Sequence, residues 1–75
     1  MQVNDKLIQF GLHVKKLRKA KRLTLTNLCY KNGLEPSTIS RIEQGLVEPK
    51  LLTLAKLAKA LDVDMNTLLE VGELI

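Results

Sequence analysis

The stretch from Leu23 to Gly45 constrains the fold most, because it predicts two short helices joined by a tight turn. Its apolar or small side chains fall where two helices crossing at a steep angle would press together: Leu28, Cys29, Leu34, Ile39 and Ile42. Gly33 lies between the two segments and can take the positive φ that a short turn demands. The stretch therefore predicts a helix-turn-helix unit at about residues 24–45.

The second of these helices carries a polar face. Four side chains recur at i, i+3, i+4 and i+7, opposite Ile39 and Ile42: Ser37, Ser40, Arg41 and Gln44. This face offers hydrogen-bonding groups and no acid. It is suited to a polar partner outside the core.

The segment resembles the helix-turn-helix of the Cro and lambda-repressor family, whose pattern reads roughly LTQxxLAxxxGxSxSTISRIExG. The chain keeps these positions of the pattern: Leu23, Thr24, Leu28, Gly33, Ser37, Thr38, Ile39, Ser40, Arg41, Ile42, Glu43 and Gly45. The resemblance continues on both sides of the motif, over about residues 12–69. It implies a compact all-α bundle of five helices that binds double-stranded DNA.

The remaining sequence also reads as helix, with no alternating strand pattern and no low-complexity linker. We expect one domain over residues 1–75, with helices at about 5–21, 24–32, 36–45, 49–61 and 64–69. Expected helix starts are the caps Thr24, Glu35 and Asp64, with Pro36 and Pro49 at or near first helical positions. Expected core residues are Leu7, Val14 and Leu17 on the first helix and a stripe on the fourth, Leu51, Leu54, Ala55, Leu57, Ala58 and Leu61.

Charge is unevenly distributed along the chain. The formal net charge is +4, with +7 in residues 1–31 and −3 in residues 32–75. Seven cations give the first two helices a field suited to phosphates: Lys15, Lys16, Arg18, Lys19, Lys21, Arg22 and Lys31. For any single lysine, a solvated helix surface remains the alternative.

Several classes of protein are disfavoured by composition. No run approaches the roughly 18 apolar residues of a membrane span, and no signal segment opens the chain, so we expect a cytoplasmic protein. Cys29 is the single cysteine and forms no metal-binding cluster with His13, so we expect a core thiol and no metal or cofactor. Paired carboxylates, a nucleophile with its base and a phosphate-binding glycine loop are missing, so we expect neither an enzyme nor a small-molecule ligand.

The resemblance also implies roles for individual residues, with the third helix in the major groove. It places Pro36, Ser37, Ser40 and Arg41 at base edges, where Arg41 could bind both acceptors of a guanine or, alternatively, contact phosphate or solvent. It places these residues at the DNA backbone: Thr24, Thr26, Thr38, Gln44, Lys15 and Arg22. It further implies an ion pair between Arg18 and Glu43 that holds the reading helix against the first helix.

Four positions depart from the family pattern. Leu25 stands where members usually have a phosphate-binding Gln, and Asn32 replaces an apolar residue. Arg22 replaces a Gly, so a non-glycine residue is expected in the left-handed region. Glu48 stands in a loop where basic or amide residues often meet the backbone and would repel it. These departures weaken binding by one subunit and favour a dimer.

The end of the chain supplies a candidate interface at about residues 64–75, because an apolar tail needs cover. The expected interface residues are Met65, Leu68, Leu69, Val71, Leu74 and Ile75. The alternative is that these side chains fold back onto their own core.

Taken with the resemblance, these features predict a sequence-specific transcriptional regulator of the prokaryotic or phage type, associated with the nucleoid. We expect it to bind a near-palindromic operator as a homodimer, as do small relatives such as the controller proteins of restriction-modification systems. The alternative is a protein-interaction module, such as the DNA-binding antitoxin of a toxin-antitoxin pair.

Overall fold

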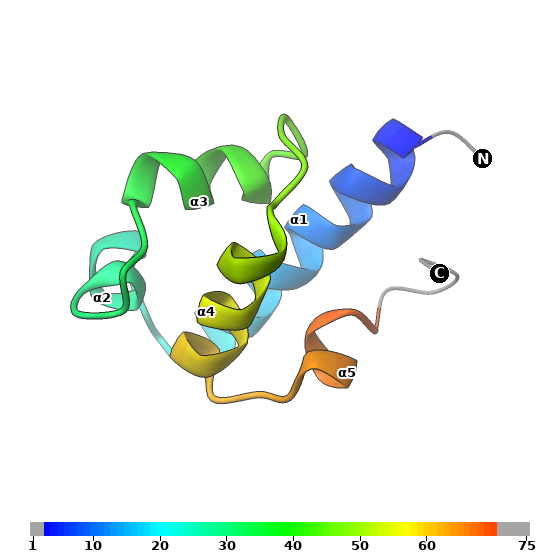
Figure 1. Cartoon of the computed structure of the whole chain (residues 1–75). Helices are drawn as coiled ribbons and strands as arrows, with labels where there is room; N and C mark the ends of the chain where they lie inside the picture. Colours follow the sequence, from blue (N-terminus) through cyan, green and yellow to red (C-terminus); the bar gives the residue numbers. More distant parts are fainter. Residues whose placement is uncertain (1–2, 71–75) are drawn as a thin grey trace.

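The computed structural model describes residues 3–70, and every regular element in that range is a helix. The elements are α1 (Val3–Ala20), α2 (Leu25–Cys29), α3 (Pro36–Glu43), α4 (Leu51–Leu61) and α5 (Met65–Leu68). Figure 1 shows α3 across one end of the molecule, α4 in front of α1, and α5 beside the far end of α4. The prediction of an all-α fold with five helices is confirmed.

Every helix contributes to one apolar core. The side chains with the least exposure are Val14, Leu28, Ile39, Ile42, Leu57, Leu61 and Leu68, which come from all five helices. Phe10 of α1 joins them, whereas Leu7 and Leu17 are only half-buried. Phe10 and Val14 therefore anchor α1 in the core more than Leu7 and Leu17 do, although the sequence predicted core positions for both leucines.

Two of the predicted helix starts are capped by their own side chains. The Thr24 hydroxyl accepts a hydrogen bond from the Asn27 N–H at 3.0 Å. The Asp64 carboxylate accepts one from the Thr67 N–H at 2.7 Å. Glu35 takes the predicted cap position before Pro36, but its side chain makes no cap bond. These three helices thus begin where a side-chain oxygen or a proline favours a helix start.

The second helix ends earlier than expected, at Cys29 and not near Asn32. Lys31 takes a left-handed φ of 61°, and the Asn32 side chain donates to the Leu28 carbonyl oxygen at 2.7 Å. A backbone in that region cannot continue an α-helix, and the side-chain bond satisfies a carbonyl of the last turn. Asn32 replaces the apolar residue of the family pattern at this position, and its side chain caps the last turn of α2.

The start of the fourth helix also differs from the expectation. Pro49 lies in the preceding loop, Lys50 is the cap residue, and α4 begins at Leu51. Leu57, Ala58 and Leu61 are buried, as predicted, but Leu51 is 73% exposed. The expected stripe was wrong at Leu51 and at Ala55, which is also exposed, whereas Leu54 packs half-buried against the core.

The fifth helix packs into the core of the same chain. Leu68 has no exposed surface, so its expected place in a dimer interface is wrong: its side chain is already covered within the monomer. Met65 and Leu69 are half-buried against the core. The other expected interface residues, Val71, Leu74 and Ile75, lie outside the described residues. The His13 ring nitrogen Nε2 lies 2.8 Å from the Thr67 carbonyl oxygen and ties α5 to α1.

Cys29 is buried in this core, and the burial raises the pKa of its thiol. Within residues 3–70, no group of three or more His, Cys, Asp or Glu side chains is arranged to hold a metal ion. In the same range, no helix combines the length and apolar character needed to cross a bilayer.

Candidate nucleic-acid interface

The third helix has two chemically different sides. Ile39, Ile42 and Glu43 are buried beneath it. Ser37, Arg41 and Gln44 are exposed, Ser40 is half-exposed, and this spacing places the four side chains along one face of α3. From Ser37 to Gln44, this exposed face is therefore polar.

A buried ion pair fixes α3 in place. Arg18 Nε lies 2.7 Å from Glu43 Oε2, and Arg18 Nη2 donates to Glu43 Oε1 at 3.0 Å. A third bond runs from Arg18 Nη1 to the Leu23 carbonyl oxygen at 2.7 Å. The hydrogen bond to Glu43 raises the pKa of the Arg18 guanidinium above its ordinary value. One side chain thus joins α1, α3 and the connection into α2.

Close backbone contact reinforces this arrangement. A Cβ atom on Gly11 would lie 2.5 Å from the Glu43 carbonyl oxygen and nearer still to that of Ile42. Gly45, at φ 74°, ends the helix where a Cβ would meet Ile8 at 2.7 Å. Only a residue without a Cβ fits at either position. The α1 and α3 backbones are therefore held nearly in contact at the C-terminal end of α3.

The start of α2 carries two of the expected backbone-contacting residues. Thr24 and Thr26 are exposed, whereas Leu25 is half-buried and packs against the core. Leu25 therefore replaces a polar family residue with one that supports the fold.

Two expected phosphate-binding cations lie on or after α1. Lys15 is exposed, yet its spacing from Gly11 and Arg18 places it along the side of α1 that meets α3. Arg22 is exposed and takes the left-handed φ that its place in the pattern predicts, 57°. A non-glycine residue in that region costs about 1 kcal/mol.

Gln44, which is expected to contact the DNA backbone, already makes hydrogen bonds to Ser40 of α3. Its Nε2 donates to the Ser40 carbonyl oxygen and to Ser40 Oγ, both at 3.1 Å. The carbonyl can only accept, so it fixes the orientation of the amide. To bind a phosphate through its N–H groups, Gln44 must first release Ser40.

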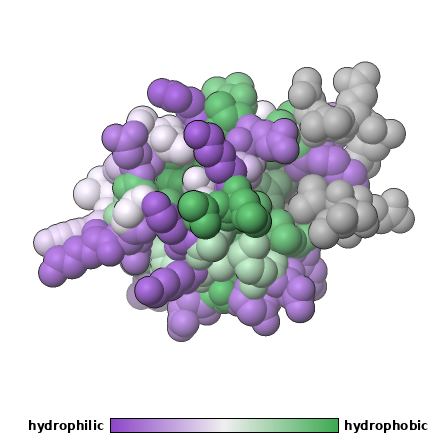
Figure 2. All heavy atoms as spheres, in the orientation of Figure 1, coloured by the Kyte–Doolittle hydropathy of each residue, from purple (hydrophilic) through white to green (hydrophobic). Residues whose placement is uncertain are grey.

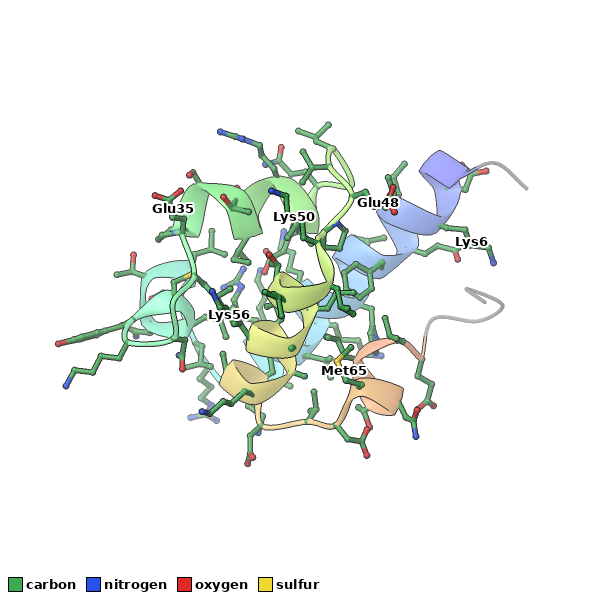
Figure 3. The ribbon with its side chains drawn as sticks, in the orientation of Figure 1. Lys6, Glu35, Glu48, Lys50, Lys56 and Met65 are labelled. Atoms are coloured by element: carbon green, nitrogen blue, oxygen red, sulfur yellow. The ribbon has the colours of Figure 1, made fainter. Side chains whose placement is uncertain are left out.

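A polar groove of about 400 Å³ lies between α3 and the start of α4. Thr38 and Arg41 line it from α3, Thr53 lines it from α4, and Lys50 lines it from the cap position before α4. Glu48 also lines the groove and brings a negative charge to it. Figure 3 shows the side chains of Glu48 and Lys50 leaving the connection between α3 and α4 in different directions. Sequence reasoning missed Lys50 and Thr53, although their positions at the start of the fourth predicted helix were a usable signal.

The sequence of this chain is similar to those of known helix-turn-helix proteins. The helix-turn-helix family HTH_3 matches residues 14–68. Two regulators of Bacillus subtilis (strain 168) align over 61 residues, or 80% of this chain. The uncharacterized HTH-type transcriptional regulator RghRB is 39% identical, and the HTH-type transcriptional regulator SinR is 38% identical. The chain matches 44% of the length of RghRB and 55% of that of SinR, so it spans about half of each relative.

The fold also matches a solved structure over most of both chains. The restriction-modification controller protein C.AhdI from Aeromonas hydrophila superposes with a TM-score of 0.82 and 34% identity. The match covers 85% of this chain and 97% of C.AhdI. The motif, the five helices and these relatives agree: the chain belongs to the HTH_3 family of helix-turn-helix transcriptional regulators.

Proposed function

We propose that this chain binds a specific double-stranded DNA sequence and regulates transcription as a homodimer, with α3 of each copy in the major groove. The polar outer face of α3 carries the proposal. It is presented by a helix whose inner face is locked by a bidentate buried ion pair and by the Gly11 contact. Such rigid presentation lets side chains meet base edges with little loss of conformational entropy on binding.

Direct reading of bases falls to Arg41, Ser37, Ser40 and Pro36 on the exposed side of α3. Arg41 suits guanine, whose O6 and N7 accept both N–H groups of a guanidinium. The exposed hydroxyls of Thr24 and Thr26 and the charges of Lys15 and Arg22 suit phosphate oxygens. Thr38 and Gln44 are further backbone contacts, and Gln44 exchanges its bonds to Ser40 for a phosphate.

The homodimer follows from the size of the reading surface. One short helix reaches only a few base pairs, which is too few for useful selectivity in a genome. Two copies related by a two-fold axis double the contacts and set half-sites about 34 Å apart, one turn of DNA. The operator is then a near-palindrome. For the contact between the two copies we propose Met65 and Leu69, which are half-buried in the monomer.

The direct test is selection of bound sequences from a random pool of duplex DNA. We expect enrichment of a symmetric site with two half-sites about one helical turn apart. Binding to the selected duplex is then measured by fluorescence anisotropy against a scrambled duplex of equal length. Equal affinity for the two duplexes would exclude sequence-specific recognition, and an enriched site without symmetry would exclude a two-fold homodimer on DNA.

A further inference from the structure

Gln44 and Ser40 form a hydrogen-bonded pair on the exposed face of α3. Gln44 Nε2 donates to the Ser40 carbonyl oxygen and to Ser40 Oγ, both at 3.1 Å. The two residues are one helical turn apart, so their side chains share a face. Figure 2 shows hydrophilic and neutral side chains over α3, whereas hydrophobic ones gather at the centre of the same view, over α4. The pair therefore lies in polar surroundings, with Gln44 exposed and Ser40 half-exposed.

The backbone at the end of α3 fixes the point from which the Gln44 side chain starts. The Gln44 backbone N–H donates to the same Ser40 carbonyl oxygen at 3.1 Å, so this oxygen accepts from both the backbone and the side chain of Gln44. Gly45 follows at φ 74°, where a Cβ would meet Ile8 of α1. Because the backbone on both sides of the side chain is held, the Gln44 amide is positioned over Ser40 before any DNA is bound.

The direction of these bonds determines which group Ser40 presents to a partner. A carbonyl oxygen only accepts, so the amide nitrogen of Gln44 faces Ser40, and the hydroxyl oxygen accepts from it as well. The hydroxyl hydrogen then points away from Gln44, and within residues 3–70 the structure shows no acceptor for it. A hydroxyl that already accepts a hydrogen bond is polarised into a better donor. Ser40 therefore presents a donor to the outside.

We propose that Gln44 is a positioning residue that makes Ser40 a hydrogen-bond donor to one base of the operator. In the major groove, guanine, adenine and thymine each present an acceptor, whereas the edge of cytosine presents only an amine donor. A donating Ser40 thus disfavours cytosine at the base position that it faces. The inference rests on the proposed function and deepens it, because it names the chemistry of one base contact.

The proposed exchange of these bonds for a phosphate is the other state of the same side chain. The N–H groups that hold Ser40 are the ones that would bind a phosphate, so Gln44 makes one contact or the other. Phosphates lie along every DNA sequence, whereas an acceptor opposite Ser40 depends on the base. Gln44 therefore contacts phosphate in non-specific complexes and holds Ser40 where the base accepts from its hydroxyl.

Selection of bound sequences with Gln44→Glu tests the inference through the identity of one base. The carboxylate only accepts, so it takes the Ser40 hydroxyl hydrogen and leaves the hydroxyl oxygen to accept from the DNA. The preferred base should change to cytosine, whose amine can donate. Selection with Ser40→Ala locates the position, because the preference is lost there and kept elsewhere. Gln44→Met, of similar length and without N–H groups, is the matched control and should reduce the preference without favouring cytosine.

Fluorescence anisotropy on two duplexes that differ only at this base pair measures the size of the effect. For the unmodified chain, cytosine should weaken binding about fivefold, the ratio that one net hydrogen bond supports. Gln44→Glu should reverse this ratio. The added charge lowers affinity for both duplexes, so the ratio is compared and not the affinity itself. When Ser40→Ala is combined with Gln44→Glu, the ratio should be about one, because no hydroxyl is left to orient.

The inference and the proposed function can fail separately. A Gln44→Glu chain that keeps the base preference of the unmodified chain would overturn the inference and leave sequence-specific binding standing. So would a cytosine preference that persists when Ser40→Ala is added. If Gln44→Glu binds too weakly for selection, undiminished discrimination against cytosine by Gln44→Met overturns the inference instead. A random pool from which the unmodified chain enriches no sequence would overturn the proposed function and the inference together.

Discussion

Arg18 ties α3 to α1 and to the connection into α2. Its guanidinium makes two bonds to Glu43 and one to the Leu23 carbonyl, and both ionised side chains are about nine-tenths buried. Removing two charges from water offsets much of their attraction, so the pair determines geometry more than it adds to stability. Losing one partner is a different matter, because it leaves the other charge buried and unpaired.

Glu43→Ala should therefore lower the free energy of unfolding by about 3–5 kcal/mol. Replacing both residues, as Arg18→Met with Glu43→Leu, should cost less than Glu43→Ala alone, because no charge is then stranded. Urea denaturation of Arg18→Met, Glu43→Leu and the double variant gives the coupling energy. Additive effects would show that the two side chains do not stabilise one another.

Arg41 belongs to the exposed face of α3, and its replacement should affect recognition without affecting folding. Arg41→Ala should weaken binding to the selected operator by about 1–3 kcal/mol and relax the preference at one base position. Selection repeated with the variant measures both effects, and Lys59→Ala on α4 serves as an exposed cationic control. Equal weakening on every sequence would reassign Arg41 to a phosphate.

At the scale of the elements, the packing of α1 against α3 depends on Gly11. A Cβ there would meet the carbonyl oxygens of Ile42 and Glu43, which belong to backbone and cannot move aside cheaply. Gly11→Ala should cost about 1–3 kcal/mol of stability despite its higher helix propensity. It should also reduce operator affinity by shifting α3. Thermal denaturation and anisotropy measure the two effects, with Leu12→Ala, at an exposed side chain of the same helix, as the control. Unchanged stability would mean that the two helices separate freely.

The cap of α5 predicts a pH dependence. Hydrogen bonding from the Thr67 N–H lowers the pKa of the exposed Asp64 carboxyl below its ordinary value of 3.8. The cap therefore contributes stability in full above the unfolded pKa and loses it as the pH falls through the folded pKa. Asp64→Asn keeps an accepting oxygen but does not titrate, so it should show a smaller loss of stability in acid than the unmodified chain. Equal acid sensitivity in melting curves would show that the carboxylate contributes nothing.

Sequence reasoning reached some elements of this fold and not others, for physical reasons. Caps such as Asp64 act within four residues, so a local pattern is enough to locate a helix start. The inner side of α4 was harder, because its apolar residues cover more than half of the helix circumference, and periodicity then cannot tell which side is buried. Packing against the other helices decides that Leu57 is buried and Leu51 exposed. Packing also decides that Leu68 of α5 is buried within its own chain. His13 and Thr67 are far apart in the sequence, so no local pattern predicts the hydrogen bond between them.

For the molecule as a whole, the uneven distribution of charge matters more than the net value. The cations of the first 31 residues lie on α1, in the connection from α1 to α2 and at Lys31 after α2. Most of the acids lie in the second half of the sequence. A polyanion is therefore attracted mainly to one half of the chain, and the attraction is screened by salt.

Operator affinity should accordingly fall steeply as salt rises, because each phosphate contact releases counterions from the DNA. Lys15→Gln and Arg22→Gln should each flatten the slope of log K against log salt by about 0.9 if the side chain contacts one phosphate. Both side chains are exposed, so neither change should unfold the chain. Lys59→Gln, in the last turn of α4 and far along that helix from α3, should leave the slope unchanged and is the matched control. Anisotropy titrations over a series of salt concentrations measure the slopes. A complex insensitive to salt would rule out phosphate contact altogether, whereas a slope flattened by Lys59→Gln but not by Lys15→Gln would place the DNA on the opposite side of the molecule from the α1 cations.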